Sequence, residues 1–142
     1  MTQKYEMGSP QWLAALHAFM VAARPGLAIA DDFALCEVYK NVPASIPSTD
    51  GTVTFTVRFR KDSMDVDFEL TEADDATVKL TLEYEDVLPL GRFVVGGDPQ
   101  RQAEMFGVLN DCVKKGRAKF EGALPAAIQD SPVHDQIARL TA

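Results

Sequence analysis

Two histidines are the first candidates for catalysis, because histidine titrates near neutral pH. His17 lies in a stretch with the helical spacing of apolar residues, and His134 lies near the C-terminus. We interpret His17 as a partly buried helix residue and His134 as a solvent-exposed one. The catalytic alternative pairs His17 with Asp31 or Asp32 as the dyad of a small cavity enzyme, of the isomerase or dehydratase kind.

The cysteines and the known motifs offer no further chemistry. Cys36 and Cys112 are far apart in the sequence, outside any C-x-x-C spacing. We expect both to be free, apolar side chains in a reducing compartment. The chain contains no H-E-x-x-H, G-x-S-x-G or G-x-x-x-x-G-K-[ST] motif. We therefore predict no catalytic residue, no metal and no cofactor.

One basic cluster stands out near the C-terminus. It contains four of the 14 Lys and Arg residues of the chain, namely Lys114, Lys115, Arg117 and Lys119. Such a run is usually a solvated edge, which also protects an exposed strand from pairing. The functional alternative is an anionic headgroup or phosphate that docks at the rim of an apolar cavity.

Composition restricts the partners and the location. The chain has 142 residues, and 14 basic against 21 acidic side chains give a net charge of −7. This field repels polyanions, so we predict no nucleic-acid partner. The N-terminus lacks the pattern of a secretory signal, and no apolar run reaches the ~18 residues of a membrane span. We expect a cytoplasmic protein without a transmembrane segment, with residues 1–142 forming a single domain.

Alternating apolar and polar residues predict a sheet. The clearest strand carries Val53, Phe55, Val57 and Phe59 on one face. Strands are expected over 33–42, 52–60, 63–70, 77–83 and 117–121. Because the connection after the second strand is too short for a crossover, we expect 52–83 to form an antiparallel meander.

Two cap signals and apolar spacing predict the helices. Ser9-Pro10 and Asp98-Pro99 each place an N-cap residue before a proline that suits the first turn. Helices are expected over 10–23, 84–93, 99–115, 124–128 and 133–140. Since one face of the sheet is apolar, we predict an α+β two-layer sandwich, with a mostly antiparallel five-stranded sheet covered on one face by helices.

The apolar face is rich in Phe and Met, and we expect Met64 and Phe68 to point inward. These side chains either fill a core or line a lipid-sized cavity between sheet and helices. On the second interpretation the ligand-binding residues are Phe55, Met64, Phe68, Leu82, Phe93, Met105 and Phe106.

Several segments carry a family resemblance. Asp98-Pro99-Gln100 and the stretch from Gly116 to Gly122, GRAKFEG, match an N-P-Q and a G-K-L-K-I-x-G pattern. The chain thereby resembles the sterol carrier protein 2-like (SCP2) domain family. Further similar segments are Gly8–Trp12, Asp50–Phe55, Leu80–Leu82 and Glu85–Leu88. The segment between Pro99 and Gly116 is longer than is usual in that family.

The resemblance implies a five-stranded sheet and helices around an apolar tunnel, without a catalytic apparatus. We therefore predict non-catalytic binding or transfer of a hydrophobic ligand, which would be a sterol, a fatty acid, an acyl-CoA or another lipid. The basic cluster would then hold the headgroup. Two other hypotheses remain: the cavity enzyme described above, and a protein–protein interaction module that forms a homodimer.

Overall fold

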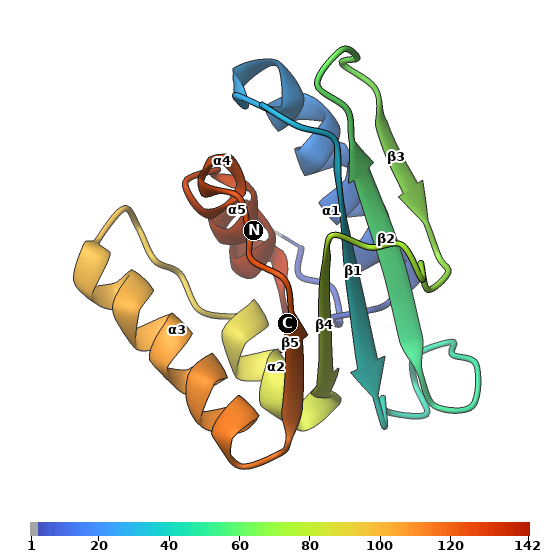
Figure 1. Ribbon diagram of the computed structural model, residues 1–142. Helices are drawn as coiled ribbons and strands as arrows, with labels where there is room; N and C mark the ends of the chain where they lie inside the picture. The colour runs from blue at the N-terminus through green and yellow to red at the C-terminus, as the bar shows by residue number, and fades with distance from the viewer. Residues whose placement is uncertain (1–2) are drawn as a thin grey trace.

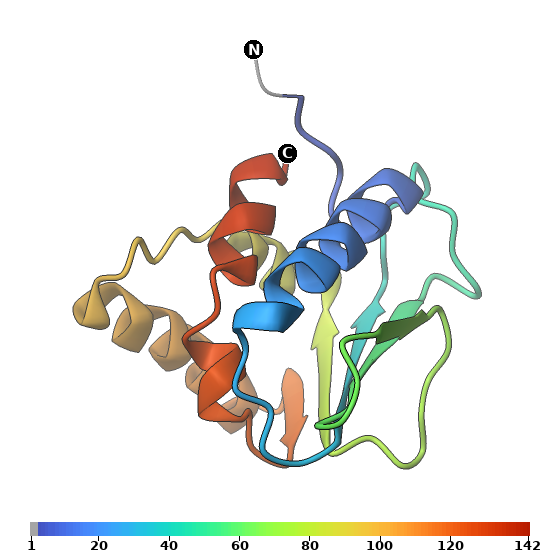
Figure 2. The same ribbon diagram turned by 90° about the horizontal axis from the view of Figure 1, so that it is seen from above.

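The computed structural model describes residues 3–142, which form a five-stranded sheet with its helices on one face (Figures 1 and 2). The strands are β1 (Phe33–Lys40), β2 (Val53–Phe59), β3 (Val66–Glu69), β4 (Val78–Glu83) and β5 (Ala118–Glu121). The helices are α1 (Pro10–Ala23), α2 (Tyr84–Gly91), α3 (Pro99–Lys114), α4 (Ala126–Gln129) and α5 (Val133–Leu140), with a 3-10 turn η1 (Arg24–Gly26) after α1. This confirms the predicted α+β sandwich.

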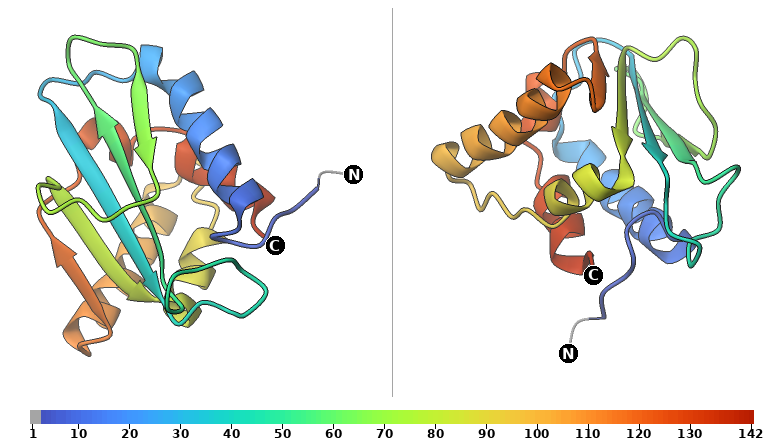
Figure 3. Two further views of the ribbon diagram at one scale, coloured as in Figure 1. Left: turned by 90° about the vertical axis from the view of Figure 1, so that its right-hand side faces the viewer. Right: turned by 90° about the horizontal axis from the view of Figure 1, so that it is seen from below.

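The sheet has the strand order β3-β2-β1-β4-β5, and all pairs are antiparallel except β1 with β4. The expected meander over 52–83 is therefore wrong in its third strand. The chain after β3 crosses the outer face of the sheet and places β4 beside β1 (Figure 3, left). The Thr56 hydroxyl donates to the Thr71 carbonyl at 2.7 Å, and the Ala34 N–H donates to the Thr77 hydroxyl at 3.1 Å. These bonds fix the crossover segment against β2 and β1.

The inner face of the sheet carries the predicted apolar side chains of β2. Phe55, Val57 and Phe59 are all at most 1% exposed. The Phe55 ring packs edge-on against Trp12 of α1 at 6.4 Å and stacks on Phe68 at 5.4 Å. Burial of these large side chains is what holds α1 on the sheet.

The inward orientation predicted for Met64 is wrong. Strand β3 is a short edge strand that begins only at Val66, so Met64 falls in the turn before it and is 60% exposed. Leu70, just past the other end of β3, is 63% exposed. Short edge strands are common because they limit unwanted pairing with other chains.

Some boundaries differ from those expected. Helix α2 ends at Gly91 with Pro89 inside its last turn, and α4 is a single turn that starts at Ala126. The two ends of the described chain meet, since the Tyr5 N–H donates to the Leu140 carbonyl and the Ala142 N–H donates to the Tyr5 carbonyl. Among residues 3–142, no helix has the length and apolar character that crossing a membrane requires.

Candidate functional site: an apolar cavity beneath helix α3

A cavity of about 680 Å³ lies between the inner face of the sheet and the helical layer. Its walls come from helices α1 to α5 and from strands β1, β2, β4 and β5, and most of the lining side chains are apolar. They include Leu35, Phe59, Leu80, Leu90, Phe120, Leu124 and Ile128. Ligand pockets for small molecules fall in the range of about 300–1,000 Å³ and are mostly apolar, so this cavity has the size and character of a ligand site.

Helix α3 covers the cavity without being fully packed. Among its residues only Leu109 is buried, while Met105 and Phe106 are half-buried and line the cavity. Figure 1 shows α3 beside β5 at its C-terminal end and farther from the sheet toward its N-terminal end. A helix with so little buried apolar surface gains little from packing, which favours local opening.

Polar side chains gather at the N-terminal end of α3 and across from it on α4 and α5. The cavity lining there includes Asp98, Gln102, Asp130, Ser131, His134 and Asp135. We call these six residues the polar rim. Three of them are carboxylates, so the rim is acidic.

Two residues of the polar rim tie α5 to the segment before α3. Asp135 accepts backbone N–H bonds from Val95 and Gly96, both at 2.8 Å. Burial acts to raise the pKa of Asp135, but these bonds prevail and hold it below its ordinary value. The His134 Nε2 lies 2.8 Å from the Phe93 carbonyl, which can only accept, so this nitrogen donates. His134 is half-buried rather than solvent-exposed as predicted, because this bond draws its ring against the chain.

The floor of the cavity contains an acidic residue, Glu37 of β1. In the strand register it lies opposite Phe55 of β2 on one side and Leu80 of β4 on the other. Glu37 is half-buried, and since it lines the cavity, its accessible part faces the interior. The Tyr39 hydroxyl donates to its Oε1 at 3.2 Å.

Burial dominates the protonation of both groups. It raises the pKa of Glu37 from 4.5 to about 7, with the Tyr39 hydrogen bond acting in the opposite direction. Burial also raises the pKa of Tyr39 well above its ordinary value, and the nearby Glu37 raises it further. Near neutral pH the cavity floor therefore holds a carboxyl group that is only partly ionised.

The sequence analysis did not identify Glu37 as a cavity residue. The alternation along the first strand could have indicated it, because Leu35, Glu37 and Tyr39 must share a face. The strand carries apolar residues on both faces, which hides the period, so the one acidic position could not be assigned to the inside.

The predicted ligand-binding residues divide into four groups. Met105 and Phe106 line the cavity. Phe55, Phe68 and Leu82 pack in the core of the sheet and are not among the lining residues, while Met64 is exposed. Phe93 is half-buried, and the Arg101 guanidinium lies over its ring, 4.3 Å from the centroid.

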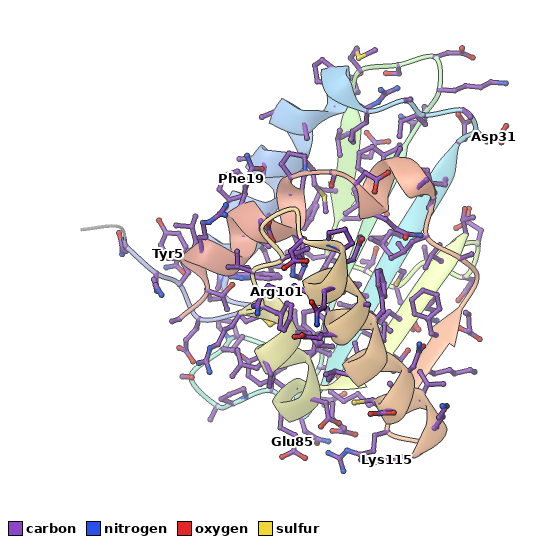
Figure 4. All side chains as sticks on the ribbon, turned by 90° about the vertical axis from the view of Figure 1, so that its left-hand side faces the viewer. Tyr5, Phe19, Asp31, Glu85, Arg101 and Lys115 are labelled. Carbon is purple, nitrogen blue, oxygen red and sulfur yellow. The ribbon has the colours of Figure 1, made fainter. Side chains whose placement is uncertain are left out.

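The basic cluster lies away from the cavity. Lys114, Lys115, Arg117 and Lys119 are exposed, and none of them lines it. They surround the C-terminal end of α3, and the polar rim lies at its N-terminal end. The 16 residues of α3 separate the two ends by about 24 Å. Figure 4 shows Lys115 and Glu85 together at one end of the helical layer. Two of the four residues form ion pairs with acidic side chains. Arg117 pairs with Glu85 and, at 2.8 Å, with Asp86, while Lys119 pairs with Glu121 at 3.2 Å.

The histidine dyad of the enzyme hypothesis does not form. The His17 Nε2 lies 3.2 Å from the Val66 carbonyl, and its ring stacks on Phe68 at 4.9 Å. The Asp32 carboxylate instead accepts the Lys61 N–H at 2.8 Å. Neither His17, Asp31 nor Asp32 lines the cavity. Within residues 3–142, no group of three or more His, Cys, Asp or Glu side chains could hold a metal ion.

Comparisons with known proteins identify the fold. No family model matches the chain, and no curated protein matches it in sequence. Among solved structures, the conserved hypothetical protein TT1886 of Thermus thermophilus, described as a possible sterol carrier protein, is similar with a TM-score of 0.52 and 9% identity over 99% of this chain and 92% of that one. A crystal structure of sterol carrier protein 2 is similar with a TM-score of 0.51 and 13% identity over 96% of this chain and 100% of that one. The chain therefore has the sterol carrier protein 2-like fold that its sequence motifs resemble.

Proposed function

We propose that residues 1–142 form a single domain that binds or transfers a hydrophobic ligand without catalysis, and that the ligand occupies the cavity beneath α3. The observation that carries the proposal is the cavity itself, which is about 680 Å³ and mostly apolar beneath a helix that buries one residue. An apolar ligand in a volume of this size would gain dispersion contacts with the lining side chains. The shared fold with a protein named sterol carrier protein 2 supports a lipid as the ligand.

The geometry favours this function over the enzyme hypothesis. The dyad of the enzyme hypothesis is not assembled, as the His17 contacts show. Homodimer formation stays a prediction, which mass measured as a function of concentration checks. The lack of a nucleic-acid partner stays a prediction, supported by the net charge of −7. The cytoplasmic location also stays a prediction.

Titration with n-alkyl ligands of increasing length tests the proposal. Burying a methylene group contributes about 0.8 kcal/mol, so affinity should rise roughly fourfold for each added methylene until the cavity is full. Native mass spectrometry of protein purified from cells should also reveal a bound lipid. Equal affinity for short and long chains would show that the apolar face is only a filled core.

A cavity-filling variant locates the binding. Met105→Trp places a bulky indole ring in the cavity and should shorten the longest chain that still adds affinity. Val108→Trp is the matched control, since Val108 lies on the same helix, is 45% exposed and does not line the cavity. An equal effect of the two variants would contradict binding beneath α3.

The headgroup role of the basic cluster stays a prediction with its own test. Charge reversal at Lys115 and Lys119 should weaken the binding of acyl-CoA more than that of a neutral sterol, and more so at low salt. Equal weakening of both ligands would remove this role.

A further inference from the structure

Glu37 is the feature of the cavity that apolar packing does not explain. It stands on the central strand β1, with Leu35 and Tyr39 beside it on the same face and Phe55 and Leu80 opposite it. A carboxyl group in such surroundings is expensive to ionise, and an apolar residue would fill the place at no such cost. The position therefore points to a use for the carboxyl group itself.

The carboxyl group also keeps unused hydrogen-bonding capacity. A carboxylate can accept about four hydrogen bonds, yet its side-chain partner within residues 3–142 is the Tyr39 hydroxyl alone, and no ion pair there includes it. The Tyr39 hydroxyl is already committed as the donor in that bond. What remains free is acceptor capacity that faces the cavity.

We propose that Glu37 selects the ligand: it accepts a hydrogen bond from a hydroxyl group on an otherwise apolar molecule, and it disfavours molecules whose inner end has no hydrogen-bond donor or is a carboxylate. This inference rests on the proposed function, and it specifies the ligand class. The hydroxyl could belong to a long-chain alcohol or to a sterol, which offer the same chemistry.

The charge distribution around the cavity supports the exclusion of carboxylates. An anionic ligand with its carboxylate inward would meet Glu37, and one with its carboxylate outward would meet Asp98, Asp130 and Asp135 of the polar rim. At the desolvated Glu37 like charges repel each other strongly, whereas the exposed Asp98 and Asp130 add a weaker repulsion that salt screens. A neutral hydroxyl meets neither penalty.

Selection should depend on pH because Glu37 changes its role when it ionises. When protonated, Glu37 can also donate, so it serves a ligand that only accepts. When ionised, Glu37 only accepts hydrogen bonds. It can then pair with a ligand that donates, whereas a ligand that only accepts is left without a partner. The preference for a hydroxyl ligand should therefore increase as pH rises through about 7, where burial places the pKa of Glu37.

Few other groups could produce the same dependence. The elements packed around Glu37 present apolar side chains and Tyr39, whose pKa is raised far beyond this range. The remaining titratable groups that line the cavity belong to the polar rim: Asp98, Asp130, His134 and Asp135. A change that persists without Glu37 would belong to these residues.

The experiment compares two neutral probes of equal length, dodecan-1-ol and methyl undecyl ether. Both displace a fluorescent apolar dye, and their affinities are measured from about pH 6 to about pH 8.5. A hydrogen bond to a charged group contributes enough that the alcohol-to-ether affinity ratio should rise about tenfold or more over this range. Dodecanoate should bind more weakly than the alcohol throughout.

The variant Glu37→Gln is the control, because glutamine has nearly the same shape, donates and accepts at every pH, and does not titrate. Its alcohol-to-ether ratio should stay constant. The wild-type profile needs no variant, so the test stands whether or not Glu37→Gln folds. A constant wild-type ratio, or the same rise in the variant, overturns the selection by Glu37 and leaves the proposed function intact. Failure of wild type to bind either probe overturns both.

Discussion

Replacing Glu37 with glutamine should make the protein more stable at neutral pH and should leave its stability nearly unchanged in acid. The carboxyl group lies in an apolar cavity floor, and burial raises its pKa from 4.5 to about 7. An acid whose pKa is higher in the folded than in the unfolded chain binds its proton more tightly in the folded chain. Its contribution to stability therefore falls as pH rises from 4.5, and it is level above about 7.

The two pKa values set the magnitude. At about 1.36 kcal/mol for each pH unit, the interval between them corresponds to about 3 kcal/mol of stability lost on going from acid to neutral pH. Because glutamine does not titrate, the Glu37→Gln variant does not lose this stability. For a domain of about 150 residues, 1 kcal/mol shifts Tm by roughly 2–4 °C. The Tm of Glu37→Gln relative to wild type should thus rise by roughly 6–12 °C over this range.

Thermal unfolding followed by circular dichroism at a series of pH values measures this difference, with lipid removed from both proteins. Other groups with shifted pKa values, such as Asp75 and Asp135, are present in both proteins and cancel in the difference. Glu69→Gln on the exposed end of β3 is the matched control for removing a carboxylate outside the cavity. A Tm difference for Glu37→Gln that stays constant with pH would refute the assignment of a buried, titrating carboxyl group to the cavity floor.

Three further predictions concern the fold and the histidines. Phe55→Ala should lower the free energy of unfolding by about 3–5 kcal/mol in denaturant titration, because Phe55 is 0% exposed and contacts Trp12, Tyr39 and Phe68. Gly122→Ala should destabilise the protein by more than about 2 kcal/mol, since φ is +84° and the added Cβ would lie 2.1 Å from the Thr77 carbonyl oxygen. The control Gly116→Ala, where φ is +73° and the added Cβ meets open space, should cost about 1–2 kcal/mol. Equal losses of stability in the two variants would contradict the close approach at Gly122. The double variant His17→Ala, His134→Ala should keep its affinity for alkyl ligands, because the Nε2 atom of each ring lies against a backbone carbonyl and an alkyl chain needs no hydrogen bond from either ring; lost binding in dye displacement would contradict this.

Local rules predicted the starts of α1 and α3 correctly. The Ser9 hydroxyl accepts the Trp12 N–H at 3.2 Å, and the Asp98 carboxylate accepts the Gln100 N–H at 2.9 Å, as the two cap signals require. These interactions involve residues close in sequence, so the sequence contains all the information needed. The inward face of β2 was predictable for the same reason, since alternation is a local property.

The position of β4 depends on which strand it pairs with, and local sequence patterns do not determine that pairing. Alternation at Val78, Leu80 and Leu82 predicts a strand and its buried face, but not which strand lies beside it. The crossover is fixed by contacts between distant residues, such as the hydrogen bond from Thr56 to Thr71 and the ion pair between Arg58 and Asp75 at 2.9 Å.

The site was predictable in character but not in its members. An aromatic and Met-rich face indicated apolar contents, yet whether a given side chain packs or lines a space depends on how far α3 stands from the sheet. Phe55 and Leu82 were therefore assigned to the ligand although they are fully buried in the core. The ion pairs of Arg117 with Glu85 and Asp86 were not predictable from local patterns, because both acidic residues lie on another helix.

Glu37 and α3 both depart from the sequence pattern expected of a well-packed core, and both departures bear on ligand binding. A natural sequence agrees with its fold at most positions, and it departs from the local rules mainly at functional sites. Glu37 departs by placing a titratable group on the inner face of the central strand, where an apolar residue would make the protein more stable. Helix α3 departs by burying one residue of 16. Both departures border the same cavity. Their coincidence argues that the space is kept open for a ligand that is apolar along its length and polar where it meets Glu37.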